Sequence, residues 1–175
     1  MKKDVWLFGY GSLIWRPGFE FKQRRKASLR HFKRRFWQGS HDHRGTPDSP
    51  GRVVTLIPEA EQQCEGVAFL IDRDILAEIF GALDHREKNG YERHFVNLEL
   101  ENGDRVEGVV YIARVENHAW LGHADISVIA SQIHASAGPS GPNPEYLINL
   151  ANALRELDIH DDHVFAIEHH LKQLP

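Results

Sequence analysis

A glutamate interrupts the apolar face of a predicted helix over residues 73–88, RDILAEIFGALDHREK. The apolar residues of that face, Leu76, Phe80 and Leu83, recur at spacings of four and three. Glu87 takes the next position, where desolvation and the negative end of the helix dipole would both raise the pKa of its carboxyl. Such a carboxyl could exchange protons near neutral pH, as a general acid/base must. A solvated glutamate paired with a neighbouring cation at a fraying helix end fits the same spacing.

A break in the first predicted strand is the second feature with chemical potential. The stretch at residues 8–15 reads FGYGSLIW, in which two glycines and a serine interrupt an apolar run. Consecutive main-chain N–H groups in such a break can form a concavity that suits a carboxylate or an oxyanion. A β-bulge or a tight barrel corner would use glycine in the same way. A dinucleotide or phosphate-binding loop does not fit, because neither a third glycine at the required spacing nor a Gly-Lys-Ser/Thr follows.

Strands dominate the first two-thirds of the chain. Apolar or alternating runs predict strands over residues 5–10, 29–37, 52–57, 66–71, 94–100 and 105–113. Asn102–Gly103 separates the last two runs and favours a β-hairpin. Residues 39–51 are rich in Gly, Pro, Asp and Ser and predict a loop.

Helices are predicted mainly in the last third. The helix over residues 73–88 would be capped by Asp72, and a second helix is expected over residues 125–137. A third would begin with Asn143 as its N-cap and proline as its first residue, and a fourth at Asp161 or Asp162. The fold class is therefore α+β, with a largely antiparallel sheet or barrel and helices packed on it.

Length and composition indicate one domain over residues 1–175. Of these residues 41% are hydrophobic and 26% charged, an ordinary balance for a soluble globular protein. No signal peptide or membrane-spanning run is recognised, so a cytoplasmic location is expected. Cys64 is the only cysteine, which excludes an intrachain disulfide and a thiolate metal cluster.

Two features suggest other functions. Residues 22–37 hold eight Lys and Arg and no acid, so a nucleic-acid-binding module with stacking aromatic residues is an alternative, although the net charge of −4 weakens it. The twelve histidines include pairs at ligand-like spacings but no complete motif, so we predict no metal site. Asp84 and His85 precede Glu87 and are expected to be solvated.

Four longer stretches resemble the ChaC family of γ-glutamylcyclotransferases. They are FGYGSLIWRP at 8–17, RRFWQGSHDHRGTPDSPGRVVTLIP at 34–58, LDHREKNGY at 83–91 and GPSGPNPEYLINLANALREL at 138–157. They follow the family's order and span nearly the whole chain. The resemblance implies a small mixed, largely antiparallel β-barrel with surrounding helices.

The same resemblance implies an activity and a site. A glutathione-specific γ-glutamylcyclotransferase, a carbon–nitrogen lyase, would convert this small-molecule substrate to 5-oxoproline and cysteinylglycine without a metal, a cofactor, nucleic acid or a membrane. Glu87 would be the catalytic acid/base. The substrate-binding residues would be Gly9, Tyr10, Gly11, Ser12, Leu13, Ile14 and Tyr146. Other γ-glutamyl amines or γ-glutamyl amino acids remain alternative substrates, because they require the same residues.

Overall fold

The computed structural model describes residues 3–88 and 90–175. The chain divides into two compact units, each described here by itself. The first contains the chain up to Lys33 together with Leu56–Arg114, and the second contains Arg34–Thr55 and Val115–Pro175. Two long strands contribute residues to both units. The described part of the chain contains no helix that is both long and apolar enough to cross a membrane.

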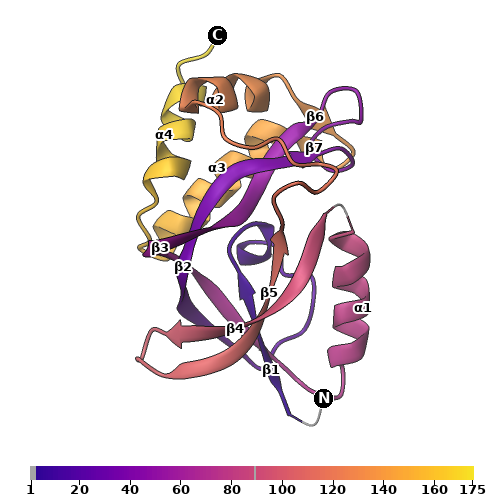
Figure 1. Ribbon diagram of the computed structural model, residues 1–175, viewed down its shortest axis with the longest axis vertical. Helices are drawn as coiled ribbons and strands as arrows, with labels where there is room; N and C mark the ends of the chain where they lie inside the picture. The colour runs from indigo at the N-terminus through magenta and orange to yellow at the C-terminus, as the bar shows by residue number, and fades with distance from the viewer. Residues whose placement is uncertain (1–2, 89) are drawn as a thin grey trace. The chain divides into compact units, whose positions relative to one another are not determined.

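A closed five-stranded barrel is the main feature of the sheet topology (Figure 1). The strands are β1 (Val5–Gly9), β2 (Gln23–Ser40), β3 (Gly51–Ile71), β4 (Tyr91–Leu100) and β5 (Arg105–Ala113), in the order β1-β3-β2-β4-β5. β1 runs antiparallel to β3 but parallel to β5, which makes the barrel mixed. The predicted α+β class and largely antiparallel mixed barrel are therefore confirmed.

The hairpin between β4 and β5 forms at the predicted turn. Nine residue pairs join the strands, from Tyr91 opposite Ala113 to Glu99 opposite Arg105. Gly103 has a φ of 89°, a conformation that favours glycine, and this explains the turn signal in the sequence. The last five residues of β5, Val109 to Ala113, are all buried.

Two predicted strands are in fact one. Residues 52–57 and 66–71 both belong to β3, which runs without interruption for 21 residues. The first prediction stopped at residue 57 because Pro58 follows, but Pro58 lies inside β3 at an exposed position. Proline is tolerated in a strand where its missing N–H is not needed by a neighbouring strand. The strand predicted over residues 29–37 is likewise the middle of the longer β2.

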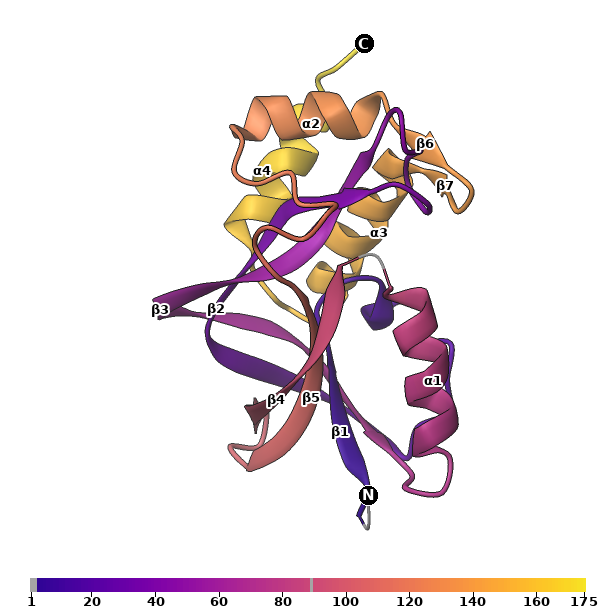
Figure 2. The same cartoon turned by 45° about the vertical axis from the view of Figure 1, so that its right-hand side comes forward.

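The helix α1 (Leu76–Arg86) belongs to the first unit and lies beside the barrel strands in each view (Figures 1 and 2). Its buried residues include Leu76, Phe80 and Leu83, as the apolar spacing predicted. The predicted cap is wrong, because Ile75 is the N-cap residue. The Asp72 carboxylate instead accepts a hydrogen bond from the N–H of Asp74 at 2.8 Å, in the turn before the helix.

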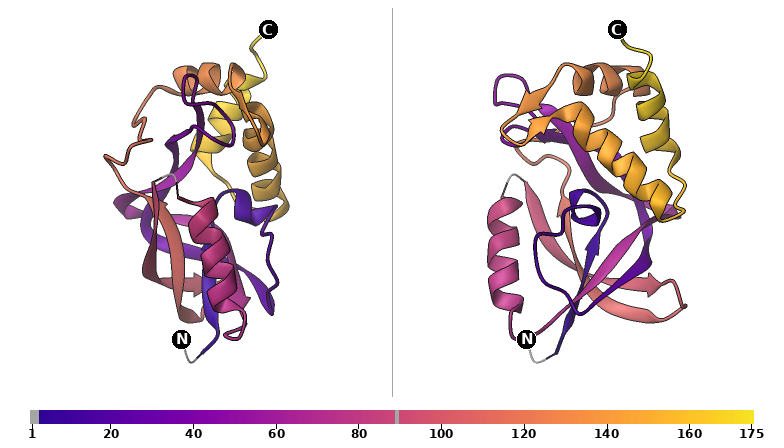
Figure 3. Two further views of the ribbon diagram at one scale, coloured as in Figure 1. Left: turned by 90° about the vertical axis from the view of Figure 1, so that its right-hand side faces the viewer. Right: turned by 180° about the vertical axis from the view of Figure 1, so that it is seen from behind.

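The second unit carries α2 (Ile126–His134), α3 (Asn143–Glu156) and α4 (Asp162–Leu171), which pack against one another (Figure 3, right). The helix predicted over 125–137 ends earlier, because β6 (Ala137–Gly138) pairs with β7 (Gly141–Pro142). The predicted start of α4 at Asp161 or Asp162 is confirmed. Asp161 is the N-cap residue, and its carboxylate accepts from the N–H of Val164 at 3.0 Å.

The sequence predicted Asn143 as the N-cap of α3, but Asn143 is the first helical residue. Its fully buried side chain instead bonds to the main chain of Arg52 on β3. The Asn143 Nδ2 donates to the Arg52 carbonyl at 2.9 Å, and the Arg52 N–H donates to Oδ1 at 2.8 Å. A tertiary contact thus uses the same polar groups that make asparagine a good helix cap.

Candidate functional site

Glu87 lies directly after the last residue of α1. Its N–H still donates to the Leu83 carbonyl at 2.8 Å, so it closes the final helical turn. Only 19% of its side chain is exposed. The position therefore agrees with the interrupted apolar face, because Glu87 follows buried residues along the same side of the helix. Its carbonyl accepts a hydrogen bond from the N–H of Tyr91 at 3.2 Å, which anchors the helix end to β4.

The break after β1 forms one short turn. The strand ends at Gly9, and Ser12–Ile14 form a single 3₁₀ turn in which the N–H of Ile14 donates to the Gly11 carbonyl at 3.0 Å. A Cβ on Gly9 would lie 2.9 Å from the Cβ of Leu13, so any larger residue would push the turn away from the strand. Gly9 thus lets the chain fold back tightly on β1.

The apolar and aromatic side chains of this loop are buried in the first unit. Tyr10 is only 6% exposed, and Leu13 and Ile14 are buried as well. The Tyr10 hydroxyl donates to the main-chain carbonyl of Tyr111 at 2.6 Å. A ligand at this loop would therefore meet mainly its main chain and Ser12. The first N–H groups of a helical turn have no partner within the turn, which leaves them able to bind an anion.

Arg86 links the loop to the end of α1. Its Nη2 donates to the Ser12 Oγ at 2.8 Å, and its Nε lies 3.8 Å from the Glu87 Oε1. The structure therefore brings Ser12 and Glu87, which are 75 residues apart in the sequence, to one guanidinium. These contacts lie entirely within the first unit.

Tyr146 belongs to α3 in the second unit. Its side chain is buried, and its hydroxyl oxygen accepts a hydrogen bond from the N–H of Val54 at 3.4 Å. The Phe36 ring meets it edge to face, with centroids 5.9 Å apart, and the Arg44 guanidinium carbon lies 5.9 Å from its ring centroid. These contacts place Tyr146 in an aromatic and cationic setting within its own unit.

Comparison with known proteins identifies the family. A model of the family described as ChaC-like protein matches residues 5–174. The chain belongs to the ChaC-like protein family. It is 42% identical over 173 residues to a glutathione-specific gamma-glutamylcyclotransferase 1 of Danio rerio, with 95% of this chain and 88% of the relative covered. It is 41% identical over 182 residues to gamma-glutamylcyclotransferase 2-3 of Arabidopsis thaliana, with 97% and 89% covered.

A solved structure supports the ChaC-like fold. The crystal structure of a gamma-glutamyl cyclotransferase specific to glutathione from yeast matches with a TM-score of 0.92 and 31% identity. The match covers 98% of this chain and 97% of the yeast chain. The barrel with its helices is therefore shared over nearly the whole length of both proteins.

Contacts of Asp84, near the candidate site, were missed by sequence reasoning. Asp84 is exposed, as expected, and its Oδ1 also accepts from the Tyr111 hydroxyl at 2.6 Å and lies 3.1 Å from the Arg93 Nε. These partners were missed because only neighbours in the sequence were considered. A signal was available, since Asp84 and Glu87 are three residues apart and such residues share one side of a helix.

The basic run of the ChaC-like chain is extensively paired with acids. Ion pairs join five of its cations to carboxylates: Lys22 to Asp4 and Asp72, Lys26 to Glu65, Arg30 to Glu99, Lys33 to Glu59 and Arg34 to Asp161. Pairing reduces the positive potential that a nucleic-acid backbone would meet. The ion pairs thus favour a structural role for this basic run over the nucleic-acid-binding alternative.

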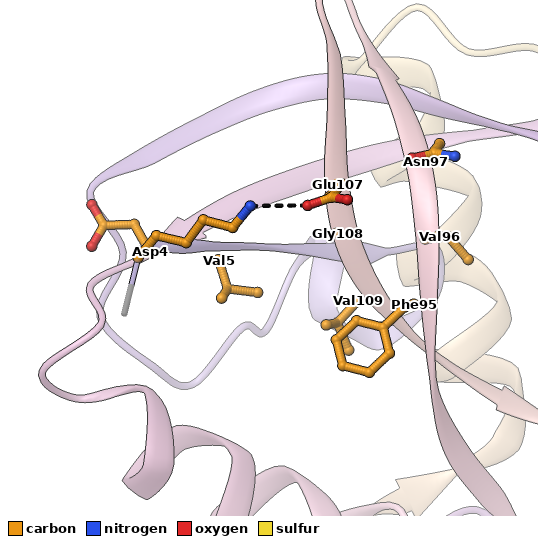
Figure 4. A pocket seen from close by; sticks show the side chains of 9 residues that line it. Asp4, Val5, Phe95, Val96, Asn97, Glu107, Gly108 and Val109 are labelled. Carbon is orange, nitrogen blue, oxygen red and sulfur yellow. Dashed lines mark hydrogen bonds and ion pairs between the residues drawn. The ribbon is translucent and has the colours of Figure 1, made fainter. Parts of the chain in front are cut away.

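The described residues contain no candidate metal site but line two pockets near the first strand and α1. Within residues 3–88 and 90–175, no three His, Cys, Asp or Glu side chains are grouped so that they could hold a metal ion. A pocket of about 350 Å³ lies between the start of β1 and strands β4 and β5, with Phe95 and the Lys3–Glu107 ion pair at its margin (Figure 4). A second, of about 450 Å³, has α1 as one wall and includes Arg86.

Proposed function

We propose that the chain is a glutathione-specific γ-glutamylcyclotransferase that forms 5-oxoproline and cysteinylglycine. The observation that carries the proposal is the contact of Arg86 with both the Ser12 loop and Glu87. It brings a candidate anion-binding loop and a largely buried carboxyl into one site of the first unit. Membership of the ChaC-like family and the names of the zebrafish and yeast relatives support this substrate.

The proposed reaction is intramolecular. The substrate's α-amine attacks its own γ-glutamyl carbonyl carbon, so that a C–N bond of the five-membered ring forms and the amide bond to cysteine breaks. No water is consumed. Well-oriented intramolecular reactions reach effective molarities of about 10⁵ M or more, so holding the glutamyl arm folded supplies much of the rate acceleration.

Glu87 carries the proton in this proposal. Its carboxylate removes a proton from the α-ammonium, which frees the nitrogen lone pair for attack, and later returns a proton to the nitrogen of the leaving cysteinylglycine. The partial burial of the side chain favours this role, because desolvation raises the proton affinity of a carboxylate.

The loop binds the γ-glutamyl end of the substrate in this proposal. Main-chain N–H groups of Gly11, Ser12 and Leu13 hold the α-carboxylate or the oxyanion that develops on the attacked carbonyl. Gly9 and Tyr10 hold the loop in place, because one allows the close turn and the other bonds to Tyr111. Tyr146 would line the substrate pocket, a role that rests on the family resemblance alone.

The two units would act as one domain in the cytoplasm. Support for one domain comes from β2 and β3, which contribute to both units, and from the family match over residues 5–174.

A second candidate function is cyclisation of other γ-glutamyl amides. The name of the Arabidopsis relative, which does not specify glutathione, favours keeping this candidate.

A product assay tests the proposal. The purified protein is incubated with reduced glutathione in the presence of a chelator, and 5-oxoproline and cysteinylglycine are quantified. We expect the two products in equal amounts and no effect of the chelator. Parallel reactions contain γ-glutamylalanine or a γ-glutamyl alkylamine. Faster turnover of either would support the second candidate, and no 5-oxoproline from any of the three would contradict both.

A further inference from the structure

We infer that Asp84 and Tyr111 form a positioning pair that fixes the position of the Ser12 loop relative to Glu87. The inference rests on the proposed function and extends it to two residues that the family comparison does not assign. The pair works through hydrogen bonds that connect the last turn of α1 with β5 and with Tyr10, all within the first unit.

Tyr111 contributes two different groups to this connection. Its hydroxyl donates to the Asp84 carboxylate at 2.6 Å, and its main-chain carbonyl accepts from the Tyr10 hydroxyl at 2.6 Å. Both are short for hydrogen bonds between oxygen atoms. Tyr10 and Tyr111 are each at least 94% buried, so water competes little for the Tyr10 bond, whereas the Asp84 carboxylate that accepts the second bond is partly exposed. One residue of a barrel strand thus joins the loop to the helix.

Asp84 is itself held from a second strand. The Arg93 Nε lies 3.1 Å from the same oxygen that accepts the Tyr111 hydroxyl. Arg93 and Tyr111 are opposite one another in the β4–β5 ladder, so their side chains project from one face of the sheet. The Arg93 guanidinium carbon lies 4.9 Å from the centroid of the Phe80 ring on α1. The arginine therefore contacts α1 through both a carboxylate and an aromatic face.

The phenol of Tyr111 serves as a donor. Burial, followed by the hydrogen bond to Asp84, raises the pKa of this phenol above its ordinary value, and the Glu87 charge acts in the same direction. Tyr111 therefore stays protonated at neutral pH, so that it holds Asp84 and does not compete with Glu87 as a base.

Two arms consequently connect the loop to the last turn of α1. The first runs from Tyr10 through Tyr111 to Asp84, and the second runs from Ser12 to Arg86. Glu87 is adjacent to Arg86 in the sequence and three residues after Asp84. Two separate attachments restrict both sliding and rotation of the loop relative to Glu87. An intramolecular cyclisation requires such precision, because a displacement of about 1 Å can reduce the rate about 100-fold.

The test compares Tyr111→Phe, Asp84→Asn and Asp84→Ala with the native protein. Each is assayed for 5-oxoproline formation with the best γ-glutamyl substrate, and thermal unfolding is recorded in parallel. We expect kcat to fall between about tenfold and 100-fold in Tyr111→Phe and Asp84→Ala, with KM changing less than threefold. Asp84→Asn keeps an acceptor oxygen for the phenol and should lose less than Asp84→Ala.

Coupling between the two residues is the decisive readout. Because Tyr111→Phe and Asp84→Ala remove the donor and the acceptor of the same hydrogen bond, the double variant of these two changes should be no slower than the slower single variant. Asp4→Asn is the matched control, since Asp4 also joins two elements of this unit but lies at the start of β1. We expect this control to keep the native kcat even where its unfolding temperature falls.

Three results would overturn the inference. Native kcat in both Tyr111→Phe and Asp84→Ala would show that the pair only stabilises the fold. Fully multiplicative losses in the double variant would show that the two residues act separately. A native protein that is inactive on every γ-glutamyl substrate would overturn both this inference and the proposed function, whereas an active native protein with unaffected variants overturns the inference alone.

Discussion

Two polar networks of the chain satisfy their hydrogen bonds in different ways. In the second unit, Asn143 and Arg52 are almost completely buried and bond mostly to main-chain groups. In the first unit, side chains bond to other side chains: Tyr111 to Asp84, and Arg86 to Ser12. Both bonds lie near the partly exposed carboxyl of Glu87. The first arrangement holds segments of backbone together, and the second leaves ionisable groups within reach of a ligand.

Arg52 shows what the buried network does. Its Nη1 donates to the carbonyls of Phe36 and Gly122 at 2.8 and 3.1 Å, and its Nε donates to Gln132 at 2.6 Å. Burial lowers the pKa of this guanidinium. Three segments of the second unit are thereby tied to β3 through one side chain. Such partners, two carbonyls and an amide side chain, are neutral and do not exchange protons with a substrate.

The network near the candidate site differs from the buried one in its exposure and in its partners. The Asp84 side chain is 45% exposed, and its contacts are the hydroxyl of Tyr111 and the guanidinium of Arg93. Every member is a side chain that can be replaced without leaving a buried main-chain group unbonded. Substitutions here should therefore affect the reaction more than the stability, and substitutions around Arg52 should do the reverse.

The largest stability effect is expected for Asn143→Ala. The change leaves the N–H and the carbonyl of Arg52 buried without their partner, at about 1–3 kcal/mol for each group. We expect the free energy of unfolding to fall by about 3 kcal/mol, measured by urea denaturation. Asn152→Ala, at an exposed position of the same helix, is the control and should change it by less than about 0.5 kcal/mol. Equal losses in the two variants would contradict the distinction between the networks.

A pH-dependent effect is expected at Glu168 on α4. Its side chain is buried, and the hydrogen bond from Arg155 lowers the pKa of its carboxyl below the ordinary value of 4.5. Because the folded pKa is the lower one, the pair stabilises the fold above pH 4.5 and the stabilisation is lost as the pH falls below it.

Acid titration of stability measures this contribution. The free energy of unfolding should fall by an additional amount on the order of 1 kcal/mol between pH 5 and pH 3 in the native protein relative to Glu168→Gln. The glutamine variant should be less stable at pH 7 and show a flatter dependence on pH. Parallel curves for the two proteins would remove Glu168 from the acid-sensitive groups.

The smallest effect is expected for Ser12→Ala. This variant loses the acceptor of Arg86 in one of the two arms that connect the loop to α1. With the Tyr10 arm intact, we expect kcat/KM to fall about fivefold, which corresponds to about 1 kcal/mol, the net value of one hydrogen bond. Ser127→Ala, exposed on α2, serves as the control. An unchanged kcat/KM in Ser12→Ala would mean that the Arg86 contact contributes nothing to the reaction.

Much of the fold was predictable because its signals are local. The β4–β5 hairpin follows from Asn102–Gly103, and the buried face of α1 follows from its apolar spacing. The uninterrupted β3 was not predictable, because Pro58 is a strong local stop signal that an exposed strand position tolerates. The cap assigned to Asn143 failed for a related reason, since a tertiary partner on β3 engages its amide.

The candidate site was predictable only in part. Spacing placed Glu87 on the buried side of α1, and the glycines marked the turn after β1. The pairing of Asp84 with Tyr111 joins residues 27 positions apart on different elements, and nothing in either local sequence specifies it. Partners of this kind are determined by how a helix packs on a sheet, which requires the three-dimensional structure.

The most direct test of the central claim is the activity of Glu87→Gln. Glutamine retains the size and shape of the side chain but cannot accept and return the proton. With thermal unfolding unchanged, we predict that 5-oxoproline formation from glutathione falls by at least about 100-fold, the low end for removal of a general acid/base. A variant that folds normally and retains a rate within about twofold of the native protein would contradict the assignment of Glu87 as the proton carrier.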